Sequence, residues 1–293
     1  DDVLVIGEKA PPNCTSPYEY ANLIMTGLAR LRAEMLDTRL RGLAVWDGTG
    51  PGAAGGTGSV VSLWQSANVP LEHIDTTTIV GSAAKHDAEP AGDEHEPTSP
   101  KLTRWVFDYA IKAMLFADAV GYSRLGEQQI PLFFEHYVGA IAAYNEATDH
   151  KPVHLETAGD GMYMVFDDTG TAGHYALGLS ELINARDWQS RGLPADLSVR
   201  NGLHCGPVFD ATDANTGLPL NSGSHTSRTA RIDPITPPGQ VYTSSAFAAV
   251  ATALGAPGLR FSYIGHTQLA KHYGVLPLYH MKRKQREGHI AGS

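Results

Sequence analysis

The chain has 293 residues, 42% of them hydrophobic, and a formal net charge of −9 at pH 7. This length and composition allow a sizeable core in one large domain or two small ones. The negative charge argues against general nucleic-acid binding, which requires a basic face. Two cysteines far apart in the chain fit neither a disulfide framework nor a zinc motif, and they are compatible with a reducing compartment.

Membrane attachment and export are also not expected. No apolar run approaches the roughly 20 residues that span a bilayer, and the first residues contain no basic leader. The sequence therefore predicts a cytoplasmic protein without a membrane span.

Residues 1–80 predict a small open α/β, Rossmann-like module. Apolar residues recur at helical spacing over 18–38. Short apolar runs at 2–7, 40–48 and 71–79 predict strands, and a second helix is expected over 58–68.

A glycine pattern in this module has two interpretations. Gly50, Gly52 and Gly55 spell G-x-G-x-x-G, and Asp75 follows at about the spacing of a ribose-binding acid. Pro51 interrupts the loop, however, and the module is too small for a full dinucleotide fold. Phosphate sensing and a plain glycine-rich surface connection both remain open.

Residues 81–100 separate two parts of the chain. They hold five acids, three prolines and no large apolar residue, so they predict an acidic flexible linker. A larger domain follows over 101–282, and a basic tail is expected at 283–293.

The larger domain again alternates strands and helices. Neighbouring residues on a strand point to opposite faces, so the adjacent His204 and Cys205 argue against a Cys–His nucleophile. In chain order the patterns predict a strand at 113–122, a helix at 129–148, two strands across 153–167, a helix at 171–192, one long strand or a strand pair at 197–211, a helix at 222–232, a strand and helix across 239–254, and closing strands at 261–265 and 276–281.

Two aspartates in this domain suggest a metal site. Asp118 follows an apolar strand directly, and a charge buried there needs a partner or a metal ion. Asp160 lies between two glycines in a tight turn. If their strands are antiparallel neighbours, the carboxylates form a hard-oxygen site for Mg²⁺ or Mn²⁺. Ordinary turn chemistry remains the alternative for Gly-Asp-Gly.

Several ordered motifs resemble one family. "MLFADAVGYSRL" and "ETAGDGMYMVF" look like the first two motifs of class III nucleotidyl cyclase domains, the adenylate and guanylate cyclase family. "RNGLHCGPVF", "GSHTSRTARI", "PGQVYTSSAF" and "YIGHTQLAKHYGVLPLYHM" resemble the segments that follow, over roughly residues 110 to 281. The resemblance implies a ferredoxin-like βαββαβ palm. It also suggests a regulatory or assembly role for the module at 1–80, because similar small α/β pieces precede cyclase domains in bacterial multidomain proteins.

It also implies roles for individual residues. Asp118, Asp160 and the backbone carbonyl of Ala119 would hold two Mg²⁺ or Mn²⁺ ions. Arg231 matches the transition-state arginine, and Lys271 matches the lysine that contacts the triphosphate. The reaction implied is conversion of a nucleoside triphosphate to a 3′,5′-cyclic monophosphate and pyrophosphate.

One departure from the family concerns the ribose. Ser227 stands where the family usually has asparagine, and serine has a shorter reach. Activity could be lower, or His225 or Arg228 could compensate. Both of these are also plausible as solvent-facing helix residues.

A second departure concerns the base. Glu156 and Leu220 replace the adenine-recognising lysine and aspartate of adenylate cyclases. This favours GTP or a pyrimidine nucleotide such as UTP or CTP over ATP. It also suggests the bacterial pyrimidine cyclases that make antiviral signals.

The resemblance further implies a symmetric homodimer with composite active sites, the aspartates coming from one chain and Arg231 and Ser227 from the other. The alternative is a degenerate cyclase domain that senses a nucleotide without turnover. A purely structural dimerisation domain is a weaker third reading.

Overall fold

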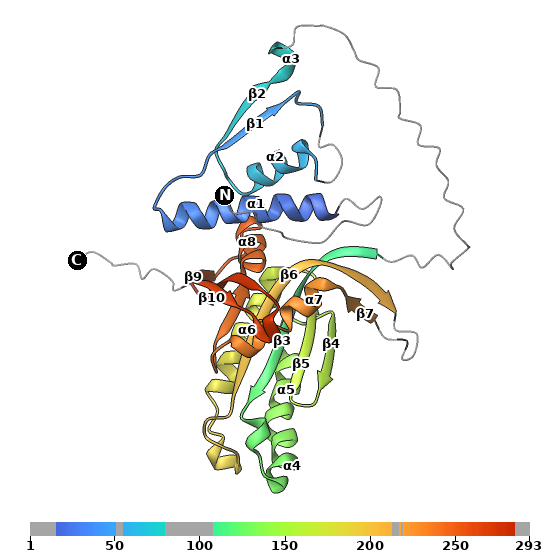
Figure 1. The fold of residues 1–293 in the computed structure, drawn as a ribbon, viewed down its shortest axis with the longest axis vertical. Coiled ribbons are helices and arrows are strands. Elements are labelled where there is room, and N and C mark those ends of the chain that lie inside the picture. The colour runs from blue at the N-terminus through green and yellow to red at the C-terminus, as the bar shows by residue number, and fades with distance from the viewer. Residues whose placement is uncertain (1–15, 51–54, 80–107, 213–216, 218, 285–293) are drawn as a thin grey trace, which may run out of the picture.

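The computed structural model describes residues 16–50, 55–79, 108–212, 217 and 219–284, and Figure 1 shows their arrangement. The elements run, in chain order, as α1 (Ser16–Met35), β1 (Gly42–Trp46), α2 (Thr57–Ser66), β2 (Leu71–Asp75), α3 (Thr76–Ile79), β3 (Asp108–Val120), α4 (Ile130–Leu132), α5 (Gly139–Ala147), β4 (His154–Ala158), β5 (Gly161–Phe166), α6 (Thr169–Asn184), β6 (Ser198–Thr212), β7 (Pro219–Ser222), α7 (Ser224–Thr229), β8 (Val241–Ser244), α8 (Ser245–Ala253), β9 (Leu259–Gln268) and β10 (Val275–Arg283).

The large sheet contains the expected ferredoxin-like palm. Its strand order among the described residues is β4-β5-β3-β6-β8-β10-β9, and β7 pairs with β6 outside this path. The first four positions hold the βαββαβ unit, in which β5 and β6 flank β3 as antiparallel neighbours. Strand β6 then pairs in parallel with β8, and β10 and β9 complete the sheet.

Strand β3 divides its side chains between the two faces of the sheet. Ala113, Leu115, Ala117 and Ala119 enter the main core, whereas Met114 packs on the opposite face with Phe116 beside it. Side chains alternate along a strand, so Asp118 shares the face of Met114 and Phe116. That face also receives α7.

Helices cover the other face. Side chains of α1, α5, α6 and α8 pack with the sheet in one core. Two of these helices begin at capping side chains that satisfy free amide groups: Asp168 accepts from the Thr171 amide at 2.7 Å, and Ser244 Oγ accepts from the Phe247 amide at 3.1 Å.

A small module precedes the palm. Strands β1 and β2 pair in parallel, and Figure 1 shows α1 lying between this module and α8. Helix α1 packs against α8 and contributes Tyr20, Leu23 and Ile24 to the main core. The module boundary at residue 80 stays a prediction, and the linker at 81–100 lies outside the described residues.

Some local expectations change. The strand predicted over 71–79 ends at Asp75, where the carboxylate accepts from the Thr77 amide at 2.8 Å and begins a short helix. The helix predicted over 129–148 has a π-helical middle at Phe133–Val138; no single residue in the sequence explains this segment. The region 197–211 forms one long strand.

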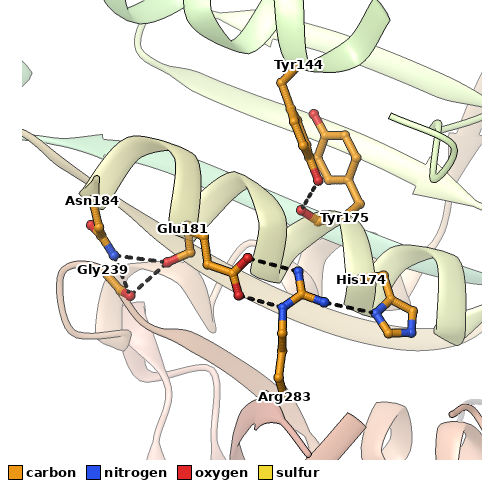
Figure 2. A network of polar contacts seen from close by, with 8 residues as sticks. Tyr144, His174, Tyr175, Glu181, Asn184, Gly239 and Arg283 are labelled. Carbon is orange, nitrogen blue, oxygen red and sulfur yellow. Dashed lines mark hydrogen bonds and ion pairs between the residues drawn. The ribbon is translucent and has the colours of Figure 1, made fainter. Parts of the chain in front are cut away.

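An ion pair joins the last strand, β10, to α6, as Figure 2 shows. Arg283, expected in the basic tail, is the final residue of β10 and donates two hydrogen bonds to Glu181, at 2.6 and 2.9 Å. Exposed ion pairs of this kind contribute modestly to stability.

The search for membrane spans, restricted to the described ranges, finds no helix long and apolar enough to cross a bilayer.

Candidate active site

Asp118 lies near the end of β3, between two particular neighbours. It is in register with Gly161 on β5 and with Arg200 on β6. The Arg200 guanidinium donates to Asp118 Oδ2, and both side chains are 27% exposed. The carboxylate that the sequence left without a partner is therefore neutralised within the chain by an arginine.

Asp160 lies beside it, in the turn between β4 and β5. Gly159 takes a φ of +65°, which glycine adopts without strain. The Ala119 amide donates to the Asp160 carbonyl at 3.2 Å, which joins this turn to the end of β3. A Cβ built on Gly161 would lie 3.7 Å from Asp118 Oδ1. The sheet thus brings together the two acidic positions that the motifs indicated.

The electrostatics of the pair are unfavourable for two ionised carboxylates. Burial raises the pKa of Asp160 above its usual range, and the nearby charge of Asp118 raises it further. A bound cation would relieve both effects.

A third acid, Asp233, is close enough to interact with this pair. It begins a 3-10 turn over Asp233–Ile235. Its pKa is raised to about 7, mainly by burial and also by the charges of Asp118 and Asp160, while the Arg200 charge acts in the opposite direction. Its Oδ1 is buried with no hydrogen-bond partner among the described residues.

Glycine makes this placement of Asp233 possible. A Cβ on Gly202 would lie 2.5 Å from the Asp233 amide nitrogen. Any larger residue at position 202 would therefore displace the turn that begins at Asp233. Arg200 also donates to the Pro234 carbonyl at 3.4 Å. Asp233 was not predicted as a site residue; the available signal was an acid two residues after the motif arginine.

A cavity of about 440 Å³ opens beside Asp118. Its lining includes Asp118, Glu156, Asp233, Phe116, Tyr163 and Thr226. Asp160 lines an adjoining hollow of about 200 Å³ together with Phe133 and Tyr137. The two aspartates therefore border neighbouring spaces at one end of the sheet.

The two residues expected to recognise the nucleotide base lie in different environments. Glu156 lies on β4 with its side chain 51% exposed, and its carboxylate is 2.7 Å from His154 Nε2. Leu220 lies on β7, paired with Ala211 of β6. Tyr163 lines the cavity, and its hydroxyl lies 3.3 Å from Thr226 Oγ1.

The residues expected at the ribose, the transition state and the triphosphate lie elsewhere. Ser227 is exposed on α7, and Arg231 follows the end of that helix with its guanidinium 6.0 Å from the centre of the Tyr273 ring. Lys271 is exposed and has a left-handed backbone, with φ 56°. None of these three residues lines the cavity beside Asp118.

His225 does not fit either role considered for it. Its side chain is only 2% exposed and is hydrogen-bonded to His204 in the interior. It can neither face solvent nor replace the family asparagine at a ribose. Cys205 enters the main core on the other face from His204, as alternation predicted.

The donor set near Asp118 fits a divalent cation. The two carboxylates and the Ala119 carbonyl are the hard oxygen ligands that Mg²⁺ and Mn²⁺ prefer. In the described part of the chain, no group of three or more His, Cys, Asp or Glu side chains is arranged to hold a metal ion. An ion held by two carboxylates would complete its coordination with backbone carbonyl, water or phosphate oxygens.

In the glycine pattern of the small module, Gly55 has a packing role, whereas a Cβ on Gly50 would meet nothing within 4 Å. Gly52 lies outside the described residues. A Cβ on Gly55 would lie 2.6 Å from Tyr18 Cβ, and the Gly55 carbonyl accepts from Asn22 at 2.8 Å. The Asp75 carboxylate accepts a hydrogen bond from the Thr77 amide. These contacts favour the surface-connection interpretation.

Sequence comparisons find no match to any family model or curated protein. Solved structures match the fold. The adenylyl cyclase CyaB from P. aeruginosa aligns with a TM-score of 0.53 at 13% identity, over 62% of this chain and 98% of that chain.

Two further matches have similar extent. The guanylate cyclase domain of RhGC from Catenaria anguillulae, in complex with GTP, gives a TM-score of 0.50 at 16% identity, over 61% of this chain and 100% of that chain. An adenylate cyclase from Trypanosoma brucei in its monomeric state gives 0.50 at 16% identity, over 64% and 93%. At these identities the likeness concerns the fold: this chain contains the palm fold of class III nucleotidyl cyclase catalytic domains.

Proposed function

We propose that this protein is a metal-dependent nucleotidyl cyclase. It would convert a nucleoside triphosphate to a 3′,5′-cyclic monophosphate and pyrophosphate. The observation that carries the proposal is the junction of Asp118 and Asp160 at one end of a class III palm fold, beside a cavity of about 440 Å³.

The reaction divides among the chain's own residues. Asp118, Asp160 and the Ala119 carbonyl would hold two divalent ions, which lower the pKa of the ribose 3′-hydroxyl and offset the triphosphate charge. The 3′-oxygen loses its proton and bonds to the α-phosphorus, and the bond to the bridging oxygen breaks as pyrophosphate leaves. Arg231 would stabilise the charge that develops on the α-phosphate.

A homodimer would complete the site. Ser227, Arg231 and Lys271 are placed away from the cavity beside Asp118. A second copy could present these residues to the first copy's aspartates, and symmetry would then produce two equivalent sites.

The base is proposed from Glu156. A carboxylate there accepts from guanine N–H groups, from uracil N3–H or from the cytosine amino group. GTP or a pyrimidine nucleotide is therefore favoured over ATP. A pyrimidine product would fit a role as an antiviral signal.

A nucleotide sensor without turnover is the second candidate. Ser227 in place of the family asparagine supports it, because an exposed serine reaches less far toward a ribose.

Product analysis separates these functions. The protein is incubated with ATP, GTP, CTP and UTP in parallel with Mn²⁺, and products are identified by mass spectrometry. We expect one cyclic nucleotide to dominate and to be absent with Asp118→Ala. Calorimetric binding of a nucleotide with no product from any of the four would instead support the sensor, and neither binding nor product would leave a structural domain.

A further inference from the structure

Three buried polar side chains, Ser244, His204 and His225, form a hydrogen-bonded row between α7 and the sheet. His204 Nδ1 lies 2.6 Å from Ser244 Oγ, and His204 Nε2 lies 2.8 Å from His225 Nδ1. The two imidazole rings are stacked, with centres 5.1 Å apart and planes 13° apart. The three side chains are at most 2% exposed, so water does not share these contacts.

This row of hydrogen-bonded side chains connects three elements. His204 lies on β6, Ser244 caps α8, and His225 is the second residue of α7. Helix α1 adds Tyr20, whose ring meets His225 edge-on at 5.7 Å and whose hydroxyl donates to the Cys205 carbonyl at 2.8 Å.

Burial keeps both histidines neutral. It lowers the pKa of His225 to about 4 and the pKa of His204 well below its usual value, and the Arg228 charge opposes protonation of both. A neutral imidazole has one N–H donor and one acceptor nitrogen. The Ser244–His204 contact and the His204–His225 contact can therefore each hold one hydrogen between two polar atoms. This pairing fixes the rotation of each ring.

Helix α7 is anchored at more than one side chain. The Thr226 hydroxyl donates to the Asn221 carbonyl at 3.4 Å and lies 3.3 Å from the Tyr163 hydroxyl. The helix spans six residues, Ser224–Thr229, and its buried side chains are His225 and Thr229. These lie four residues apart on one face, whereas Ser227 is two residues from each and faces outward. The Thr229 hydroxyl donates to the His225 carbonyl at 2.8 Å, within the helix itself.

The fit behind His225 is close. A Cβ on Gly206 would lie 2.2 Å from His225 Nδ1, so the imidazole occupies the space that this glycine leaves. The His225 ring, held by contact with β6 and by a hydrogen bond to His204, is thus the fully buried anchor at the start of α7.

We propose that His225 is a positioning residue, which fixes α7 through His204 and Ser244 and so places Ser227 and Arg231 for the reaction. The inference rests on the proposed function for its kinetic consequence. The ring would touch no substrate and act only through the helix.

Two variants and a control test this role. His225→Phe keeps a ring but removes the hydrogen bond to His204, and His225→Asn keeps an amide near the Nδ1 position. Ser180→Ala removes another buried hydrogen bond, from Ser180 Oγ to the Gly239 carbonyl at 2.7 Å, on α6. Ser180 belongs to no proposed binding or catalytic group.

We expect His225→Phe to lower kcat about 10- to 100-fold while KM changes less than about threefold, the pattern of an interaction lost mainly in the transition state. His225→Asn should recover most of the loss, and Ser180→Ala should keep kcat. An unchanged kcat in His225→Phe, or an equal loss in Ser180→Ala, would overturn the positioning role.

Hydrogen exchange gives a readout that needs no turnover. Amides of 225–231 should exchange about tenfold faster in His225→Phe, while β3 and β5 keep their rates, because local opening depends on local anchors. Unchanged exchange in α7 would overturn the inference. If the wild-type protein forms no product with any nucleotide, the proposed function fails, and this measurement still decides the role of His225.

Mixed dimers add a directional test. His225→Phe combined with Asp118→Ala should turn over faster than either alone, because one site regains an intact α7 and intact aspartates. His225→Phe combined with Arg231→Ala should show no gain. Equal behaviour of the two mixtures would contradict an effect carried by α7.

Discussion

The two halves of the proposed site are held in different ways. Asp118 and Asp160 lie in a sheet end, tied by strand pairing, by the Ala119 amide and by Arg200. Ser227 lies on a six-residue helix, and Arg231 and Lys271 lie beyond it; Ser227 and Lys271 are exposed, whereas Arg231 is half-buried. The carboxylate half of the proposed site is thus preformed within one chain. The other, outward half exposes two of its three residues, as the proposed sharing of the site between two chains requires.

The largest effect should come from the preformed half. Asp160→Asn keeps the backbone carbonyl that receives the Ala119 amide but removes a metal-binding charge. We expect turnover to fall about a thousandfold, because metal ions supply several kcal/mol of charge stabilisation. Product formation and calorimetric Mn²⁺ titration measure this. Turnover within tenfold of wild type would contradict the role of Asp160.

A smaller loss is expected in the outward half. Arg231→Lys keeps the charge but loses the planar donor pair. Turnover should fall about a hundredfold, the scale of one lost transition-state donor, with little change in KM. Steady-state kinetics check this, with exposed Arg191→Lys as the matched control. A larger rise in KM than fall in kcat would place Arg231 in ground-state binding instead.

Base selection should respond more weakly. Glu156→Gln replaces two acceptor oxygens with one acceptor and one donor group. We expect kcat/KM for the preferred nucleotide to fall about tenfold relative to the other three, the size of one altered hydrogen bond to a charged group. Competition among the four nucleotides measures the ratio, with the exposed Glu146→Gln as control. An unchanged ranking would remove Glu156 from base recognition.

The smallest effect concerns the stability of the α7 region. The folded protein holds the pKa of His225 at about 4, below its ordinary value of 6.5. The unfolded chain therefore binds more protons between these values, and stability falls as the pH falls through this window. His225→Phe removes this contribution.

Denaturant unfolding tests that sign. Between pH 6 and pH 5 the free energy of unfolding should decline by about 1 kcal/mol less in His225→Phe than in wild type. An identical decline in the two proteins would show that His225 does not titrate as its burial implies.

The sequence predicted the strands that carry the two aspartates. The apolar run before Asp118 and the glycines around Asp160 are local signals, and they indicated a strand end and a tight turn at these positions. The order of strands in the palm followed from the family resemblance, which the structural matches confirm at the level of the fold.

The long-range contacts of the site could not be predicted from the sequence. Arg200 reaches Asp118 across a strand pair 82 residues apart, and Asp233 is brought close only because Gly202 lacks a side chain. His225 lies on a helix too short to show a periodicity, so its inward orientation could not be read from the pattern. Each of these positions depends on tertiary packing.

Complementation between two inactive variants tests the composite site most directly. Asp118→Ala and Arg231→Ala each lack one half, so each alone should be inactive. After mixing and subunit exchange, half of the dimers contain one intact site, and activity should recover to about a quarter of wild type. Mixed dimers that are confirmed by mass and yet form no cyclic nucleotide would contradict the account.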